Sequence, residues 1–237
     1  MHRSVVLRPV LAGLVTAGLL LSSVAAQAQT CDPNTEARLQ FLESRLDDGA
    51  ANMKLWWRSW LAVFAIGLVY KTYDGATAGD HSNAAAAYFA AGKSALGIAE
   101  LTLRPHVGRF GAEPMRAIPK TSAQNCADRL ALAEKSMQLA ADDAGMRWSW
   151  KRHLTSFVLN LGVGLAVAEG WDDKRTGWGD FGISEFSSEL HIFTHPVRAK
   201  DDWDDYQHQF SGAPRAELGS TFDLAATRGG LGFVWRF

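Results

Sequence analysis

The chain has 237 residues, of which 47% are apolar and 21% are charged. This balance excludes a disordered polyelectrolyte and is sufficient for one apolar core. The 24 Lys and Arg side chains nearly balance the 25 Asp and Glu side chains, which gives a formal charge of -1. Since positive charge is not concentrated in any stretch, the sequence predicts no nucleic-acid partner.

The first 28 residues have the order of a secretory signal peptide. Arg3 and Arg8 precede an apolar stretch over residues 10–21, and Ala26 and Ala28 follow at the spacing of a cleavage site. We therefore predict that residues 1–28 are removed on export. The mature chain is expected in a bacterial-type cell envelope, either membrane-associated or periplasmic. An uncleaved anchor is the alternative, although the apolar stretch is short for a span.

The remaining chain repeats one order of features. Each copy has a cysteine, an amphipathic stretch, a tryptophan cluster, an apolar segment, a loop rich in Gly and Asp, and a return segment that ends near a proline. The first copy covers residues 29–105 and the second covers residues 122–196. This shared order predicts an internal duplication. Two unrelated hairpins of similar build are the alternative.

Each copy is predicted to form a long helix followed by a return helix. Apolar residues recur at helical spacing, and Asp32 followed by Pro33 is typical of a helix start. The expected helices cover residues 33–73, 83–103, 122–169 and 181–194. Alternation within residues 189–195 also fits a strand.

Two further segments flank the second copy. Residues 106–121 are rich in Pro and Gly, which predicts an irregular linker. Residues 197–237 begin as an acidic, polar segment, and residues 217–226 and 231–237 then predict a small C-terminal β-hairpin. The expected fold class is mainly α: a four-helix, membrane-associated bundle of two tandem hairpins, with that β-hairpin at its end.

The two cysteines stand at corresponding places in the two copies. Cys31 and Cys126 each lie at the start of a leading helix, and an oxidising compartment favours a disulfide between them. Such a bond would close a long loop and stabilise the fold by about 4 to 5 kcal/mol in the chain-entropy model. Two unpaired thiols are the alternative.

Aromatic residues bracket the apolar segments, as at a lipid–water interface. These interfacial aromatics are Trp56, Trp57, Trp60, Trp148, Trp150, Trp171 and Trp178. They indicate a lipid bilayer or envelope proteins as partners. A soluble core is the alternative, because the first apolar segment is only about ten residues long.

A polar site at the interface of the two copies is a further hypothesis. Lys93 and Glu100 lie on one face of the first return helix, and Glu100 aligns with His191 in the second copy. His191 and His195 are four residues apart, a spacing that places them on one helix face. We interpret these histidines as surface residues at a helix end. The paired carboxylates Asp142 and Asp143 are interpreted as solvated, so no metal and no cofactor is predicted.

No catalytic motif is recognisable, and an enzyme is therefore disfavoured. The sequence favours an exported envelope protein of structural or interaction type. The alternatives are a small transporter or enzyme that uses the polar site, and a soluble periplasmic binding module.

Overall fold

The computed structural model describes residues 31–104, 106–212, 221–227 and 230–236, and the predicted signal peptide lies outside these ranges. The described chain is mainly helical, as the sequence predicts. Its helices are α1 (Pro33–Thr77), α2 (His81–Leu103), the short 3-10 helix η1 (Val107–Phe110), α3 (Glu113–Arg116), α4 (Ala123–Arg147), α5 (Trp150–Gly170), α6 (Lys174–Phe193) and α7 (Arg198–Ser211).

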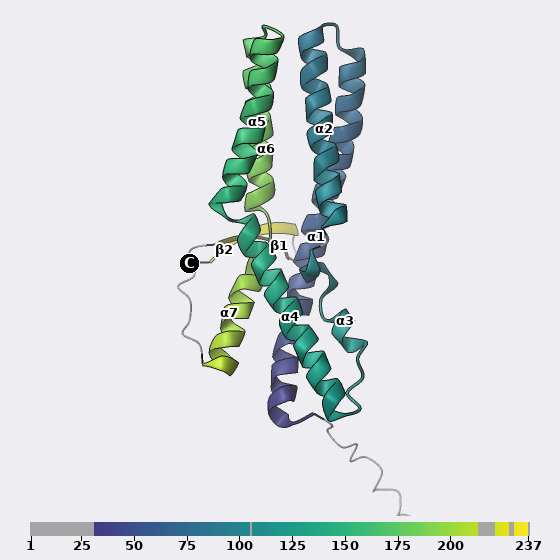
Figure 1. The fold of residues 1–237 in the computed structure, drawn as a ribbon, viewed down its shortest axis with the longest axis vertical. Coiled ribbons are helices and arrows are strands. Elements are labelled where there is room, and N and C mark those ends of the chain that lie inside the picture. The colour runs from purple at the N-terminus through teal and green to yellow at the C-terminus, as the bar shows by residue number, and fades with distance from the viewer. Residues whose placement is uncertain (1–30, 105, 213–220, 228–229, 237) are drawn as a thin grey trace, which may run out of the picture.

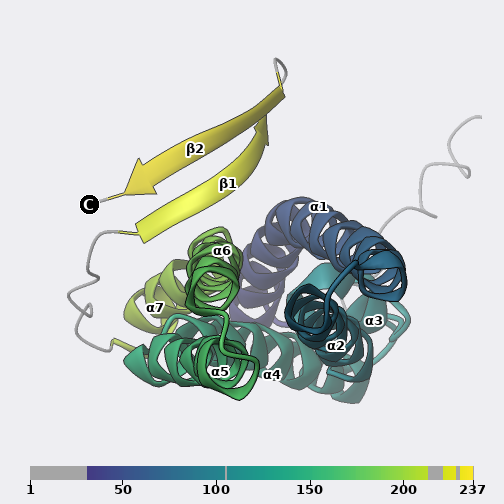
Figure 2. The same ribbon diagram turned by 90° about the horizontal axis from the view of Figure 1, so that it is seen from above.

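Two helical hairpins stand side by side above a lower bundle (Figure 1). The first hairpin consists of the C-terminal half of α1 and α2, and the second consists of α5 and α6. The lower bundle contains the N-terminal half of α1 with α3, α4 and α7. Figure 2 looks down on the molecule and shows the hairpins as separate pairs. The molecule therefore has two regions of different construction.

The predicted first long helix is confirmed, and it begins where the sequence indicates. The Asp32 carboxylate accepts the backbone N–H groups of Asn34 and Thr35, both at 3.0 Å, and Pro33 occupies the first turn. These contacts satisfy N–H groups that have no partner within the helix. α1 then continues for 45 residues, through the lower bundle and into the first hairpin.

The prediction of one continuous helix over residues 122–169 is wrong. α4 ends at Arg147, and α5 begins at Trp150 after Ser149, which has extended backbone angles (φ -74°, ψ 148°). The Ser149 hydroxyl donates to the Met146 carbonyl at 2.7 Å and so competes with helical hydrogen bonding. The Trp148 indole donates to the His195 carbonyl at 3.3 Å, a tertiary contact that favours a break here.

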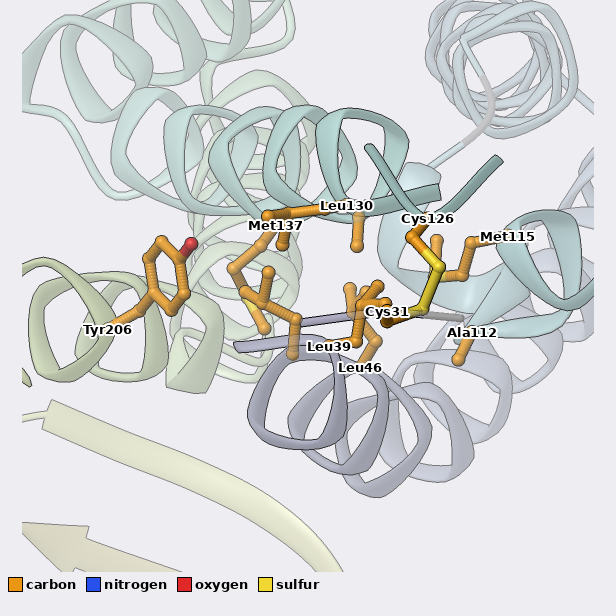
Figure 3. Close-up of a cluster of buried hydrophobic side chains, with 11 residues drawn as sticks. Cys31, Leu39, Leu46, Ala112, Met115, Cys126, Leu130, Met137 and Tyr206 are labelled. Carbon is orange, nitrogen blue, oxygen red and sulfur yellow. A yellow bond between two sulfur atoms is a disulfide. The ribbon is translucent and has the colours of Figure 1, made fainter. Parts of the chain in front are cut away.

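The lower bundle has an apolar core that includes a disulfide (Figure 3). Cys31 and Cys126 are bonded, with Cα atoms 5.5 Å apart, which confirms the predicted pairing. The core joins side chains from α1, α3, α4 and α7. Its members that Figure 3 labels are Cys31, Leu39, Leu46, Ala112, Met115, Cys126, Leu130, Met137 and Tyr206.

Two segments for which the sequence predicts no helix contain helices. Residues 106–121 contain η1 and α3, which bury Ala112 and Met115 in the lower core. The acidic segment after residue 197 forms α7, whose Tyr206 is buried against α1 and α4. Spacing of the aromatic residues in α7 places them on one face, and burial of that face stabilises the helix despite its charge.

Two strands lie in the region where the sequence predicts a β-hairpin. β1 (Thr221–Thr227) and β2 (Gly230–Arg236) pair antiparallel, with Ala226 opposite Leu231. Residues 228–229, which connect them, are outside the described ranges.

None of the described helices combines the length and the continuous apolar character needed to cross a bilayer.

Candidate functional site

A cavity of about 760 Å³ lies between the two hairpins. Side chains from α1, α2, α5 and α6 line it. Lys93, Glu100 and His191 all reach this cavity, so the structure brings together three residues of the predicted polar site. On the α2 side the cavity remains open because the residues that face it, including Ala86 and Ala87, are small.

Every charged side chain that lines the cavity has a partner of opposite charge. Lys93 Nζ lies 3.0 Å from Asp180 Oδ2 and also donates to the Ser184 hydroxyl. Three cations and three carboxylates contribute to the lining, and they form the pairs Lys71–Asp74, Lys93–Asp180 and Arg152–Glu100. The lining therefore carries no net charge.

The rest of the polar lining consists of neutral hydroxyls and amides. Asn160 is buried, and its amide nitrogen donates to Glu185 at 2.9 Å and to Ser188 at 3.1 Å. These contacts link α5 to α6 beneath the surface of the cavity. The neutral polar residues of the lining are Asn83, Ser94, Thr155, Ser156, Asn160, Thr176, Ser184, Ser187 and Ser188.

The floor of the cavity is a cluster of aromatic rings around His191. The His191 ring stacks on Trp56 with centroids 4.9 Å apart and meets the edge of Trp60 at 4.8 Å. Both indoles donate to the Thr194 hydroxyl, at 3.2 Å and 3.0 Å. Burial lowers the pKa of His191 to about 3, which keeps the ring neutral. The interpretation of His191 as a surface residue is wrong.

Glu100 is held at this floor by two arginines. Its carboxylate accepts from Arg152 at 2.6 Å and from Arg147 at 2.9 Å. Burial acts to raise the pKa of Glu100, but the two guanidinium groups outweigh it and hold the pKa below its ordinary value. Glu100 is therefore an ionised member of a paired network.

His195 lies behind the floor and does not line the cavity. It is only 1% exposed, and its Nε2 lies 3.5 Å from Nδ1 of the equally buried His106. His106 Nδ1 is 3.0 Å from Asp143 Oδ2. Ligand atoms of these three residues lie within 4.8 Å of one another, a separation that one metal ion could bridge. Sequence reasoning placed His195 on the surface, and that interpretation is also wrong.

Asp143 is not the solvated carboxylate that the sequence suggested. Arg147 Nε donates to both of its oxygens at 3.0 Å. Burial would raise its pKa, but the contacts with His106 and Arg147 lower the pKa to about 2. The same arginine also affects His195. The pKa of His195 is well below its ordinary value, mainly because the ring is buried and also because Arg147 is positively charged.

The predicted interfacial tryptophans divide into two groups. Trp56 and Trp60 are buried, and Trp57 donates to the Leu101 carbonyl at 2.9 Å. These three, like the half-buried Trp148, belong to the internal packing. Trp150, Trp171 and Trp178 are exposed.

Sequence reasoning indicated no role for His106 or Asp180, and it interpreted Asp143 as solvated. A signal for His106 was present, since Pro105–His106 and His195–Pro196 each follow a return helix, with His106 directly after the end of the first predicted copy. The partners of the charged residues depend on how α4 and α6 pack, which the sequence does not specify.

Comparisons with protein-family models, curated proteins and solved structures find no match for this chain.

Proposed function

We propose that this chain is an exported, membrane-associated protein that holds a small, neutral, polar solute between its two hairpins. The observation that carries the proposal is a cavity between the hairpins in which apolar side chains alternate with paired charges and neutral hydrogen-bonding groups, while other large apolar side chains of the same helices are exposed outside it. The proposal joins the predicted membrane association with the predicted polar site.

The chemistry of the cavity supports a neutral polar solute. Its volume of about 760 Å³ is in the range of small-molecule sites. Since the lining charges are already paired, a charged solute would need to break one of the ion pairs. The hydroxyls and amides between those pairs offer both donors and acceptors, which suit a hydroxyl-bearing or amide-bearing molecule.

The outward faces of the same helices support contact with lipid. Phe186 on α6 and Val69 on α1 are each 71% exposed. Large exposed apolar surfaces are rare on soluble monomers and mark contact with a membrane or a partner. The outward residues include Ile66, Val69, Tyr73, Phe157, Val158 and Phe186.

Exposed aromatic residues at both ends of α5 favour lipid over a protein partner. Trp150 begins this helix and Trp171 directly follows it. Trp side chains concentrate where lipid meets water, which matches this placement.

Neighbouring residues on α6 give a matched test of membrane contact. Ser187 lines the cavity, whereas Phe186 is exposed outside it. Single cysteines at these positions would be labelled with a charged methanethiosulfonate, with and without vesicles of phosphatidylethanolamine and phosphatidylglycerol. We expect vesicles to slow the labelling of Phe186→Cys and to leave Ser187→Cys reactive. Equal labelling of Phe186→Cys in both conditions would contradict membrane contact.

Solute binding requires a separate measurement. Thermal unfolding of the whole chain would be followed with a panel of neutral polyols, sugars and amino acid amides. We expect at least one to raise the unfolding temperature of the wild type and to have no effect on Ser188→Leu, which fills the cavity. Thr72→Leu, on the exposed side of α1, is the control. A shift that persists in Ser188→Leu, or no shift with any compound, would refute the solute site.

A further inference from the structure

Three residues from separate elements converge beneath the cavity. His106 lies just after α2, His195 just after α6, and Asp143 on α4, at the junction of the hairpins with the lower bundle (Figure 1). His106 Nδ1 lies 3.0 Å from Asp143 Oδ2 and 3.5 Å from His195 Nε2. Residues from three separate segments thus direct nitrogen and oxygen atoms to one point.

No placement of the ring protons gives every inward-facing atom of this cluster a hydrogen bond. If His106 Nδ1 donates to the Asp143 carboxylate, the same nitrogen has no lone pair to offer His195. His195 Nε2 then points a lone pair at a nitrogen that already donates elsewhere, across 3.5 Å, which is long for a hydrogen bond. If His195 Nε2 instead donates to His106, the carboxylate faces an unprotonated nitrogen.

The two rings of the cluster are buried, and their outward nitrogens have no partner in the described part of the chain. Both histidines are 1% exposed, and among the described residues neither His106 Nε2 nor His195 Nδ1 has a hydrogen-bond partner. Buried polar atoms without partners are rare and call for an explanation. A cation between His106 Nδ1, His195 Nε2 and Asp143 would bind the lone pairs that the protons of the cluster leave unused, and each outward nitrogen would then carry the ring proton.

We propose that His106, Asp143 and His195 bind one divalent first-row transition-metal ion of the zinc class. Bonds of about 2.0 to 2.1 Å in a tetrahedral site place neighbouring ligand atoms roughly 3.3 Å apart. The observed separations of 3.0 Å and 3.5 Å lie on either side of this value. Imidazole and carboxylate ligands suit zinc, cobalt and iron better than calcium or magnesium.

The surroundings hold these ligands in place. The Trp56 ring meets the edges of His106 and His195 with centroids 5.1 Å and 4.7 Å apart. Arg147 donates to the Asp143 carboxylate, which fixes its orientation, and also donates to Glu100. Fixed ligand orientations of this kind raise metal affinity.

A small cavity of about 30 Å³ lies beside Asp143 and has room for a water molecule, and neither His106 nor His195 lines it. Three protein ligands with a water are typical of an open metal site. Bound metal would join the ends of α2 and α6 to α4, and so fix both hairpins to the lower bundle.

The test is metal binding by the whole chain after chelator treatment and buffer exchange, with Zn²⁺ and Co²⁺ as the probes. We expect one equivalent of Zn²⁺ by calorimetry, and Co²⁺ absorption bands typical of nitrogen and oxygen ligands. Sulfur-to-cobalt bands should be absent, because both cysteines are in the disulfide. This measurement uses the wild type alone, so it does not depend on whether a variant folds. A wild type that binds neither ion would overturn the proposal.

Variants identify the ligands. His106→Gln and Asp143→Asn should each weaken Zn²⁺ binding at least about 100-fold, since even the loss of an orienting group costs about 10- to 100-fold. His153→Gln is the matched control, because this histidine pairs with Glu189 at 2.7 Å and is not in the cluster. Binding that survives both ligand substitutions would assign the metal to another site and refute the proposal.

Discussion

The lower bundle and the paired hairpins differ in what lies between their helices. The lower bundle encloses leucines, methionines and a disulfide, and places its charged residues around them. The hairpins bury a smaller apolar cluster at their base, which includes Trp56, Trp60 and Leu101. Above it they enclose a cavity that contains ion pairs and hydroxyls, and they leave many large apolar side chains exposed. One helix, α1, takes part in both arrangements along its length. Stability and binding are therefore expected to depend on different parts of the molecule.

Hydrophobic burial accounts for this division of roles. Burial of apolar surface stabilises a fold by roughly 25 cal/mol per Å². The core of the lower bundle contributes this free energy without any need for lipid. A hairpin that keeps apolar groups outside gains it only when lipid or another apolar phase covers them. Substitutions of the same type should consequently have different effects in the two regions.

The largest expected effect is loss of the disulfide of the lower bundle. Cys31 and Cys126 close a loop with a sequence separation of 95 residues. In the chain-entropy model, a loop of this length stabilises the native state by about 4 to 5 kcal/mol. Urea unfolding of the Cys31→Ser, Cys126→Ser double variant should show a loss of this size. A loss below about 1 kcal/mol would mean that the unfolded chain is already constrained.

The next largest effect should come from truncation of a buried leucine in the lower bundle, compared with truncation of an exposed residue in a hairpin. Leu42 is fully buried in the lower core, and Leu42→Ala should lower the free energy of unfolding by about 3 kcal/mol. The matched variant on the outer face of the first hairpin is Val69→Ala. Since Val69 is largely exposed, its truncation should change stability by less than about 0.5 kcal/mol without lipid. Equal losses for the two variants in urea unfolding would contradict the division of the molecule.

Two glycines of α6 should respond to alanine with opposite signs. A Cβ at Gly177 would lie 2.5 Å from the Gly164 carbonyl oxygen of α5, and this backbone atom cannot move aside cheaply. Gly177→Ala should therefore force the helices apart and cost about 1 to 3 kcal/mol. A Cβ at Gly182 meets nothing within 4 Å, so Gly182→Ala should stabilise the helix by up to about 1 kcal/mol. Thermal unfolding distinguishes the two, and destabilisation by both would disprove the close-contact explanation.

Features that depend on residues close together in the chain were predictable from the sequence. Asp32 with Pro33 marks the start of α1, and the apolar spacing of its first half indicates the face that is buried. The disulfide followed from the corresponding positions of its cysteines. The break at Ser149 was not predictable from propensity, because a contact between Trp148 and the distant His195 backbone accompanies it.

The candidate site was only partly predictable for the same reason. Lys93, Glu100 and His191 could be proposed as neighbours from the repeated order of features, and they line one cavity. Their partners could not be proposed, since Asp180 meets Lys93 only when α6 packs beside α2. Two histidines near a helix end resembled surface residues, yet the aromatic floor formed by Trp56 and Trp60 buries them.

The last predicted effect is a pH dependence that originates at the junction of the two regions. The pKa of His191 falls from 6.5 to about 3 on folding, because burial excludes the charged ring. Between these values the unfolded chain binds a proton that the folded chain does not bind. His191 therefore destabilises the fold progressively as the pH falls below about 6.5, by up to about 1.4 kcal/mol per pH unit, and has no such effect above that pH.

Replacement of the ring tests the origin of this slope. His191→Phe keeps an aromatic ring over Trp56 but cannot bind a proton, so its stability should fall less steeply than that of the wild type between about pH 6.5 and pH 5. Urea unfolding in the presence of a chelator measures both slopes without interference from metal. His208→Gln, on the exposed side of α7, is the control and should keep the wild-type slope. Identical slopes for His191→Phe and the wild type would show that the ring at the cavity floor is accessible to protons in the folded protein, and that the junction is not sealed as the contacts with Trp56 and Trp60 indicate.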